Sequence, residues 1–177
     1  MIEVLVVALW AMLPAYVPNN AAVLFGGGRP IDGGRTHDGK RLLGDGKTWK
    51  GTAGGTFTGI LVALGLNALV PLIPTDNFLP TFPALVVVTL PFGAMLGDLG
   101  ASFLKRRLGR ERGAAVPGLD QLDFVIGALA LTVFLAPAWF LDTFTLPVIS
   151  VVLIVTPIFH LCTNVAAYQI GWKNEPY

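Results

Sequence analysis

The chain has 177 residues, of which 54% are hydrophobic and only 13% charged, and its mean hydropathy is +0.68. This composition excludes an ordinary soluble domain and predicts an all-α, polytopic membrane protein. The net charge of +1 says little about partners, and the single cysteine, Cys162, excludes both an intramolecular disulfide and a thiolate metal site.

Five stretches are long and apolar enough to cross about 30 Å of hydrocarbon as helices. They cover residues 4–24, 52–72, 79–97, 122–141 and 146–168. These spans predict a single membrane domain over residues 1–177, with longer loops at about 25–51 and 98–121. The first stretch lacks a basic start, so we expect a retained span rather than a removable signal peptide.

Positive charge is concentrated in the two longer loops. Of the 12 Lys and Arg residues, six lie in 25–51, five in 98–121 and one, Lys173, in the tail. Positive residues favour the cytoplasmic side of a membrane. With five spans, all of them fall on that side if the N-terminus is outside. We therefore predict a multi-pass protein of the cell membrane whose C-terminus and active site face the cytoplasm.

The first loop reads GGGRPIDGGRTHDGKRLLGDGKTWKG and contains nine glycines and six cations. Exposed backbone N–H groups and cations together suit the binding of a polyphosphate. We expect Lys47 and Lys50 to contact phosphates. The segment GDGKT at 44–48 is not a P-loop, because Arg41 stands where that motif requires glycine and no strand is predicted before it.

Asp98 follows the third apolar stretch, so we expect it at the cytoplasmic end of the third helix. A carboxylate there opposes the helix dipole and should have a positive partner. If the helix continues, Ser102, Lys105 and Arg106 share its face. The alternative is a simple ion pair with Lys105, or an interfacial position without a role.

Two further carboxylates, Asp120 and Asp123, lie one helical turn apart in PGLDQLDF, which begins the fourth span. They could be ordinary helix-start residues. However, the third helix ends and the fourth begins on the same side of the membrane, so both carboxylates can converge with Asp98. Carboxylates facing the cytoplasm beside Lys and Arg are typical of a Mg²⁺ site that bridges to phosphate oxygens.

Polar residues inside the spans predict a lining for a head-group cavity, formed by Asn19, Asn20, His160 and Asn164. His160 as a general base stays an alternative, although a membrane histidine is more often a hydrogen-bond partner between helices. Asn67 is expected to be structural. Gly59 and Gly65 could support a homodimer or pack within one subunit.

At this point the motifs resemble a known family. The pattern S-x-x-K-R at 102–106, followed by Pro-Gly and by D-x-x-D at 120–123, resembles the signature of the phosphatidate cytidylyltransferases. The small size, the five predicted spans, the loop DGKRLLGDGKTWKG and the ending HLCTNVAAYQIGWKNEPY are more similar to the archaeal members of that superfamily, the CDP-archaeol synthases.

The resemblance implies that CTP and 2,3-bis-O-geranylgeranylglycerol 1-phosphate react to give CDP-archaeol and pyrophosphate, with Mg²⁺ as cofactor. It implies metal ligation by Asp98, Asp120 and Asp123, and a catalytic role for Lys105 beside Arg106. Gln121 replaces an arginine that is usual in the wider family, so a phosphate contact is expected from Arg110, Arg112 or the first loop. The expected partners are CTP, the lipid phosphate and the bilayer, with no nucleic acid.

Two other functions compete with this interpretation. A CDP-alcohol phosphotransferase would require D-G-x-x-A-R, whereas Asp38-Gly39 is followed by Lys40-Arg41. A transporter or assembly protein would place its charges near the membrane midplane, whereas here they lie in loops.

Overall fold

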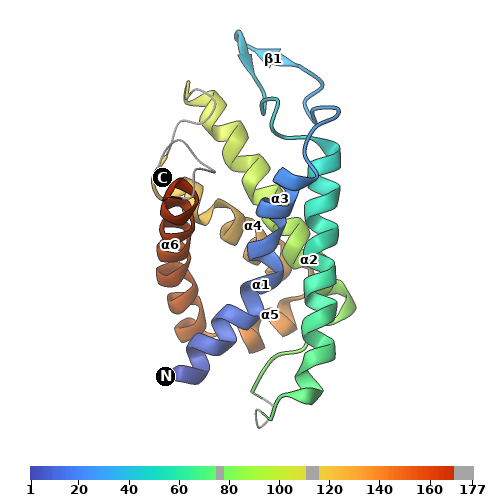
Figure 1. The fold of residues 1–177 in the computed structure, drawn as a ribbon, viewed down its shortest axis with the longest axis vertical. Coiled ribbons are helices and arrows are strands. Elements are labelled where there is room, and N and C mark those ends of the chain that lie inside the picture. The colour runs from blue at the N-terminus through green and yellow to red at the C-terminus, as the bar shows by residue number, and fades with distance from the viewer. Residues whose placement is uncertain (75–77, 111–115, 170–177) are drawn as a thin grey trace.

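The computed structural model describes residues 1–74, 78–110 and 116–169, without the side chains of residues 163, 164, 166 and 167. Its helices form one bundle (Figure 1). In chain order the elements are α1 (Ile2–Leu24), β1 (Thr36–His37), β2 (Lys40–Arg41), α2 (Trp49–Leu69), η1 (Val70–Leu72), α3 (Ala84–Arg107), α4 (Leu119–Leu135), α5 (Pro137–Thr143) and α6 (Leu146–Gln169). The predicted helical architecture is therefore observed, with one addition, the small β1–β2 hairpin.

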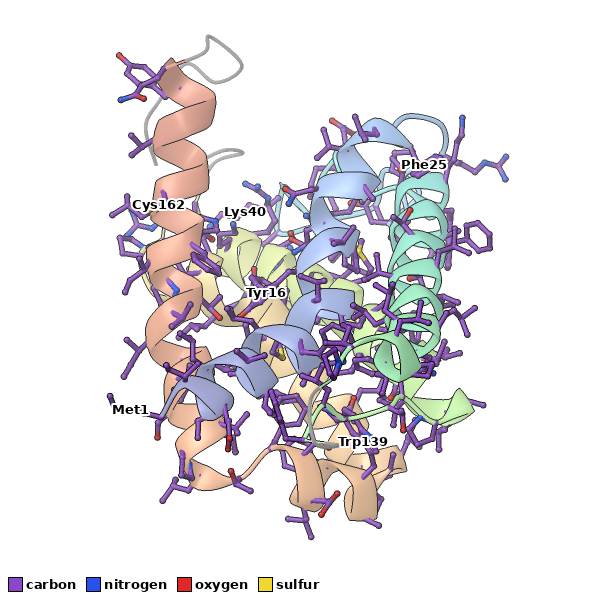
Figure 2. All side chains as sticks on the ribbon, turned by 60° about the horizontal axis from the view of Figure 1, so that its bottom comes forward. Met1, Tyr16, Phe25, Lys40, Trp139 and Cys162 are labelled. Atoms are coloured by element: carbon purple, nitrogen blue, oxygen red, sulfur yellow. The ribbon has the colours of Figure 1, made fainter. Side chains whose placement is uncertain are left out.

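Three elements of the described chain are long and apolar enough to cross a membrane, namely α1, α2 with η1, and α3. The pair α5 and α6 gives a fourth span if it is counted as one, although it is bent by 79° at the break. Large apolar side chains such as Phe57 and Ile154 are exposed on the helices. Figure 2 shows side chains projecting outward around the bundle. The structure is thus that of a membrane protein, and the count of five spans stays a prediction.

The predicted helix over 122–141 is wrong as a continuous element. α4 ends at Leu135, Ala136 has φ −134° and ψ 56°, and Pro137 begins α5. Proline lacks the N–H that would continue the hydrogen-bond ladder, and it disfavours a helical conformation in the residue before it. Local proline chemistry therefore divides a stretch that hydropathy alone treats as one span.

The third helix differs from the prediction at both ends. It begins at Ala84, directly after Pro83, and it continues to Arg107 instead of ending near residue 97. Lys105, Arg106 and Arg107 occupy its last turn, where cations interact favourably with the helix dipole. Asp98 consequently lies inside α3 and not at its end, which corrects the predicted position.

Glycines allow α3 and α4 to approach with their backbones in contact. A Cβ atom added at Gly93 would lie 2.7 Å from the carbonyl oxygen of Gly127, and one added at Gly97 would lie 2.1 Å from the carbonyl oxygen of Asp123. Such distances leave no room for a side chain. Small residues spaced four apart are a common way for membrane helices to pack closely, and here they place Asp98 next to the first turns of α4.

The α1–α2 contact uses the same device. A Cβ atom at Gly55 would lie 2.5 Å from the carbonyl oxygen of Pro18, and one at Gly59 would lie 2.4 Å from the Cβ atom of Pro91 on α3. Gly59 therefore packs within the chain, whereas Gly65 has no neighbour of this kind within 4 Å. Near the opposite end of the bundle, the amide of Asn67 exchanges two hydrogen bonds with the backbone of Phe82, at 2.8 and 2.7 Å, which confirms its expected structural role.

The loop between α1 and α2 folds back on itself at the end of the bundle that lies away from the N-terminus (Figure 1). Its two ends are joined by an antiparallel bridge between Pro30 and Thr48. At its tip, Asp38 and Gly39 adopt φ values of 53° and 72°, the conformation that a two-residue hairpin turn requires. Thr48 then caps α2 by accepting a hydrogen bond from the Gly51 N–H. The glycine-rich loop is thus a folded segment at this end of the helices.

Candidate active site

Asp32 organises the loop from its interior. Its side chain is buried, and its two oxygens accept hydrogen bonds from the Arg41 guanidinium and from the backbone N–H groups of Gly34, Leu43 and Gly44 at 2.7–3.3 Å. The Arg41 guanidinium, helped by these N–H groups, holds the pKa of the Asp32 carboxyl well below its usual range, although burial opposes this effect. The sequence interpretation did not single out Asp32, although an aspartate before paired glycines is typical of such turns.

Lys47 connects the loop to α3 through an ion pair. Its Nζ atom donates to both carboxylate oxygens of Asp98, at 2.7 and 2.5 Å, across 51 residues of sequence. Both side chains are only partly exposed, at 26% and 19%. The positive partner that was expected for Asp98 is therefore Lys47 of the first loop, and not Lys105.

Lys105 pairs with a different carboxylate. Its Nζ atom lies 2.7 Å from Asp120 Oδ1, while Asp120 Oδ2 accepts a hydrogen bond from the Val116 N–H at 2.8 Å. This second ion pair joins the C-terminal part of α3 to the first turn of α4. Asp120 thereby also has the helix-start role that the sequence allowed.

Asp123 is the most buried of the three predicted carboxylates, with 9% of the residue exposed. One of its oxygens accepts a hydrogen bond from the N–H of Phe124 at 2.6 Å. Its charge interacts with those of Asp98, Lys105 and Asp120, and the two aspartates repel it. The predicted convergence of the third and fourth helices is therefore observed, and the backbone contact at Gly97 is its cause.

The three carboxylates differ in how well their positions suit a shared metal ion. Among the described residues, no group of three or more His, Cys, Asp or Glu side chains is placed to share one ion. Asp120 is turned toward Lys105 and Val116, whereas Asp98 and Asp123 lie near enough for their negative charges to repel each other. One or two carboxylates completed by phosphate oxygens and water are the usual donor set for Mg²⁺. Asp98 and Asp123 fit such a set, and a site with all three aspartates would require Asp120 to turn away from Lys105.

The predicted phosphate-binding residues lie at the same end of the bundle. Ser102 is buried on α3, and Arg106 donates to the carbonyl oxygen of Arg110 at 2.5 Å. Lys50 and Arg110 are exposed. Arg112 lies outside the described residues. The cluster therefore combines partly buried ion pairs with cations that are free to face solvent, as binding of a polyphosphate requires.

The predicted polar lining is only partly defined. Asn19 is half-buried, and its Oδ1 atom has no hydrogen-bond partner within the described part of the chain. Asn20 is exposed, and His160 is half-buried on α6. The side chain of Asn164 lies outside what the structure describes. A cavity for the lipid head group stays a prediction.

Arg107 was missed by the sequence interpretation, which stopped at the neighbouring Lys105-Arg106 pair. Its guanidinium donates to the backbone oxygens of His37, Lys40 and Arg41 at 3.1–3.4 Å and lies over the Phe103 ring, 5.4 Å from the centroid. Arg107 thus attaches the hairpin to α3. The third cation in K-R-R was a visible signal, but only the fold shows which loop it meets.

The whole chain is similar in sequence to known proteins. The family model for CarS-like CDP-archaeol synthase matches residues 1–177. A CDP-archaeol synthase from Halobacterium salinarum is 61% identical over 179 residues, covering 100% of this chain and 99% of that protein. One from Natronomonas pharaonis is 58% identical, covering 99% and 98%. A third, from Methanosarcina acetivorans, is 48% identical and covers 94% of this chain.

A solved structure is also similar. It is described as an intramembrane enzyme for archaeal membrane lipids biosynthesis, and it is 37% identical with a TM-score of 0.74, covering 89% of this chain and 92% of its own. The helical bundle and the cluster of acids and cations at one end define a membrane-embedded enzyme. The chain belongs to the CDP-archaeol synthase family.

Proposed function

We propose that the protein transfers a cytidylyl group from CTP to 2,3-bis-O-geranylgeranylglycerol 1-phosphate, which gives CDP-archaeol and pyrophosphate. Family membership over the full chain supports the reaction. The observation that carries the assignment of the site is the glycine contact between α3 and α4, because it brings Asp98 and Asp123 together beneath a cationic loop.

In this reaction an oxygen of the lipid phosphate attacks the α-phosphorus of CTP. The new P–O bond forms as the bond to the β-phosphate oxygen breaks, and pyrophosphate leaves with the electron pair. The attacking oxygen is already anionic near neutral pH, so the site needs no strong general base. Its main tasks are to position two anions and to neutralise their charge. His160 therefore needs no catalytic role.

The residues divide this work. Asp98 and Asp123 would hold Mg²⁺, which supplies charge neutralisation at the phosphate oxygens when it is bound. Lys47, now paired with Asp98, is placed to donate to the phosphates of CTP once these approach the carboxylates. Lys105, held by Asp120, and its neighbour Arg106 on α3 would supply further positive charge to the phosphates. Asp120 thus orients a cation in the present arrangement, and its role as a third ligand is the part that mutation must test.

The bilayer supplies the second substrate. The isoprenoid chains of the lipid phosphate stay in hydrocarbon while its phosphate reaches the charged end of the bundle, which we place at the cytoplasmic surface. The distribution of Lys and Arg residues supports this orientation, because cations favour the cytoplasmic side. Six lie in the first loop, and four more lie between Asp98 and residue 110. The exposed apolar faces of α1, α2 and α3 agree with lateral access from the membrane.

The test uses the full-length protein, purified in detergent, with radiolabelled CTP, Mg²⁺ and the lipid phosphate. We expect equimolar CDP-lipid and pyrophosphate, and we expect both to vanish when either substrate or the divalent cation is omitted. Consumption of an added CDP-lipid by an alcohol, without use of CTP, would instead identify a CDP-alcohol phosphotransferase and refute the proposal.

A further inference from the structure

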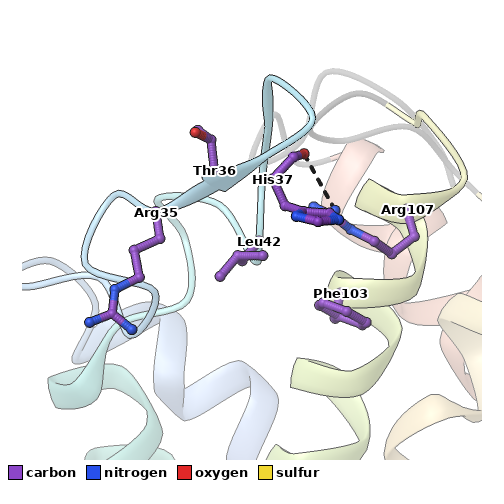
Figure 3. A pocket seen from close by; sticks show the side chains of 6 residues that line it. All are labelled: Arg35, Thr36, His37, Leu42, Phe103 and Arg107. Carbon is purple, nitrogen blue, oxygen red and sulfur yellow. Dashed lines mark hydrogen bonds between the residues drawn. The ribbon is translucent and has the colours of Figure 1, made fainter.

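A second charged region lies on the other side of α3. A pocket of about 530 Å³ opens between the loop and the end of this helix, and it is lined by Arg35, Thr36, His37, Leu42, Phe103 and Arg107. Figure 3 shows the two arginines on opposite sides of the pocket, with Leu42 between them and the Phe103 ring below the Arg107 side chain. Asp98, Asp123, Lys47, Lys105 and Arg106, the residues proposed to act in cytidylyl transfer, are not among them.

The position on the helix separates this pocket from the carboxylate cluster. At about 100° per residue, Phe103 and Arg107 project roughly 140° and 180° away from Asp98, whereas Lys105 projects close to it. Asp98 and Lys105 indeed meet Lys47 and Asp120, while Arg107 meets the hairpin. The helix therefore presents one face to the cluster and the other to the pocket.

The pocket is suited to an anion. Two guanidinium groups and an imidazole line it, and no acidic side chain is among its lining residues. The carboxylate of Asp38 lies 3.4 Å from His37 Nε2, on the exposed tip of the hairpin. The Nε atom of Arg107 is buried and has no hydrogen-bond partner among the described residues. Guanidinium groups are a usual means of binding phosphate. The Arg35 side chain points away from Arg107 in Figure 3, so a phosphate held by both would require Arg35 to turn toward the pocket.

The surroundings indicate where that phosphate would come from. Phe103 is 45% exposed, and Leu104 and Leu108 beside it are exposed as well, while cations alternate with them along the last turns of α3. α3 is one of the elements long and apolar enough to span the membrane. Apolar side chains interleaved with Arg and Lys at the end of a spanning helix are typical of the lipid–water interface, where lipid phosphates lie.

We propose that this pocket binds the phosphate group of an anionic membrane lipid, separately from the lipid that reacts. The lipid's apolar part would rest on Phe103, and its phosphate would join Arg35 of the loop to Arg107 of the helix. A bound headgroup would thus fasten the hairpin to α3 at the membrane surface. The shared chemistry is that of a phosphate ester, so free phosphate and the phosphates of CTP are the competing sources.

Binding of dioctanoyl phosphatidylglycerol to the full-length protein in a neutral detergent tests this directly, by calorimetry and without turnover. The wild-type protein should bind it, and dioctanoyl phosphatidylcholine, which has no net charge, should bind at least about tenfold more weakly. Arg35→Gln should weaken phosphatidylglycerol binding roughly tenfold, the effect expected for one charge-assisted contact. Arg29→Gln removes another exposed arginine of the same loop, outside the pocket, and it should leave binding unchanged within about twofold.

Three results would overturn the proposal. Equal losses in Arg35→Gln and Arg29→Gln would show general attraction to a basic loop. Inorganic phosphate that competes as well as the lipid would make the site one for free anions. CTP that displaces the lipid from the wild-type protein would identify the pocket as part of the nucleotide site. Because the readout is binding, a failed cytidylyltransferase assay would not affect the outcome. His37→Gln provides a second variant if Arg35→Gln is poorly folded.

Discussion

Asp32 in the loop and the pair Asp98 and Asp123 at the α3–α4 contact lie at the same end of the molecule. They differ in how many hydrogen bonds their carboxylate oxygens accept. Asp32 in the loop accepts hydrogen bonds from three backbone N–H groups and from Arg41. The acceptor capacity of its carboxylate is therefore used within the loop. Asp123 at the α3–α4 contact accepts one hydrogen bond from the chain beside it and is repelled by Asp98.

This difference separates an acid that stabilises the fold from the acids that we propose bind a cation. A carboxylate surrounded by donors gains nothing from a further cation, whereas two neighbouring carboxylates with few donors gain from any positive charge placed between them. Lys47 partly supplies that charge to Asp98. The comparison therefore predicts that loss of Asp32 lowers stability, and that loss of Asp98 or Asp123 lowers activity.

The largest effect is expected for Asp98→Asn and Asp123→Asn. Each removes one of the two charges that would hold Mg²⁺, and we expect turnover to fall at least about 100-fold while the protein stays folded in detergent. Initial rates of CDP-lipid formation at saturating CTP give the measurement. Asp142→Asn, an identical change at an exposed position on α5, should have the wild-type rate. Near-normal rates in both site variants would remove these aspartates from the site. Asp120→Asn, measured alongside, tells whether a third ligand is needed.

The next effect concerns the helix contact that joins the two aspartates. Gly97→Ala places a Cβ atom where the carbonyl oxygen of Asp123 would be only 2.1 Å away, so α3 and α4 must separate. We expect a loss of about 1–3 kcal/mol in stability and a strong loss of turnover.

Gly100→Ala is the matched control for this change, because no heavy atom would lie within 4 Å of its added Cβ atom. Alanine also favours a helix more than glycine does, so this variant should be at least as stable as the wild type. The thermal unfolding midpoint and the rate of CDP-lipid formation are the two readouts. Equal behaviour of the two variants would mean that the close contact is not needed.

The approach of these aspartates to one another was easier to predict from the sequence than the structure around them. Hydropathy and the spacing of Asp98, Asp120 and Asp123 were sufficient to expect their convergence, because both depend on local patterns. The end of α3 was missed, since residues after 97 are polar enough to leave the membrane and yet continue the same helix. The break at Pro137 was missed for the opposite reason, since an apolar composition continues through it.

The sequence alone did not predict which residues far apart in the chain would contact each other. Lys47 and Asp98 lie 51 residues apart, and Arg107 meets backbone oxygens more than 60 residues away. Neither contact follows from periodicity, because each depends on how the loop folds around Asp32. Asp32 itself was not singled out, since the sequence of the loop does not show which of its three aspartates is buried.

A smaller effect, on stability alone, is expected for Asp32→Asn. The neutral side chain loses its ion pair with Arg41 and weakens the hydrogen bonds from the loop backbone, at a cost of about 2 kcal/mol. The folded-state pKa of Asp32 is lowered, so its stabilisation is complete above the unfolded value of about 3.9 and is lost as pH falls below it. Unfolding midpoints of both proteins should therefore differ at neutral pH and converge in acid. A constant difference across that range would contradict the assignment.

The smallest effects concern the two loop lysines, and they sharpen the contrast between paired and exposed charge. Lys47 is partly buried against Asp98, so Lys47→Ala both removes a phosphate donor and leaves that carboxylate without its lysine partner. We expect the KM for CTP to rise about tenfold.

Lys50 is exposed in the first turn of α2, and solvent screens its charge, so Lys50→Ala should raise the KM for CTP less than about threefold. Steady-state kinetics with either substrate varied will distinguish these outcomes. An effect of Lys47→Ala confined to the lipid phosphate would assign the lysine to that substrate, because the ammonium group that approaches Asp98 would then be guiding the nucleophile and not the leaving pyrophosphate.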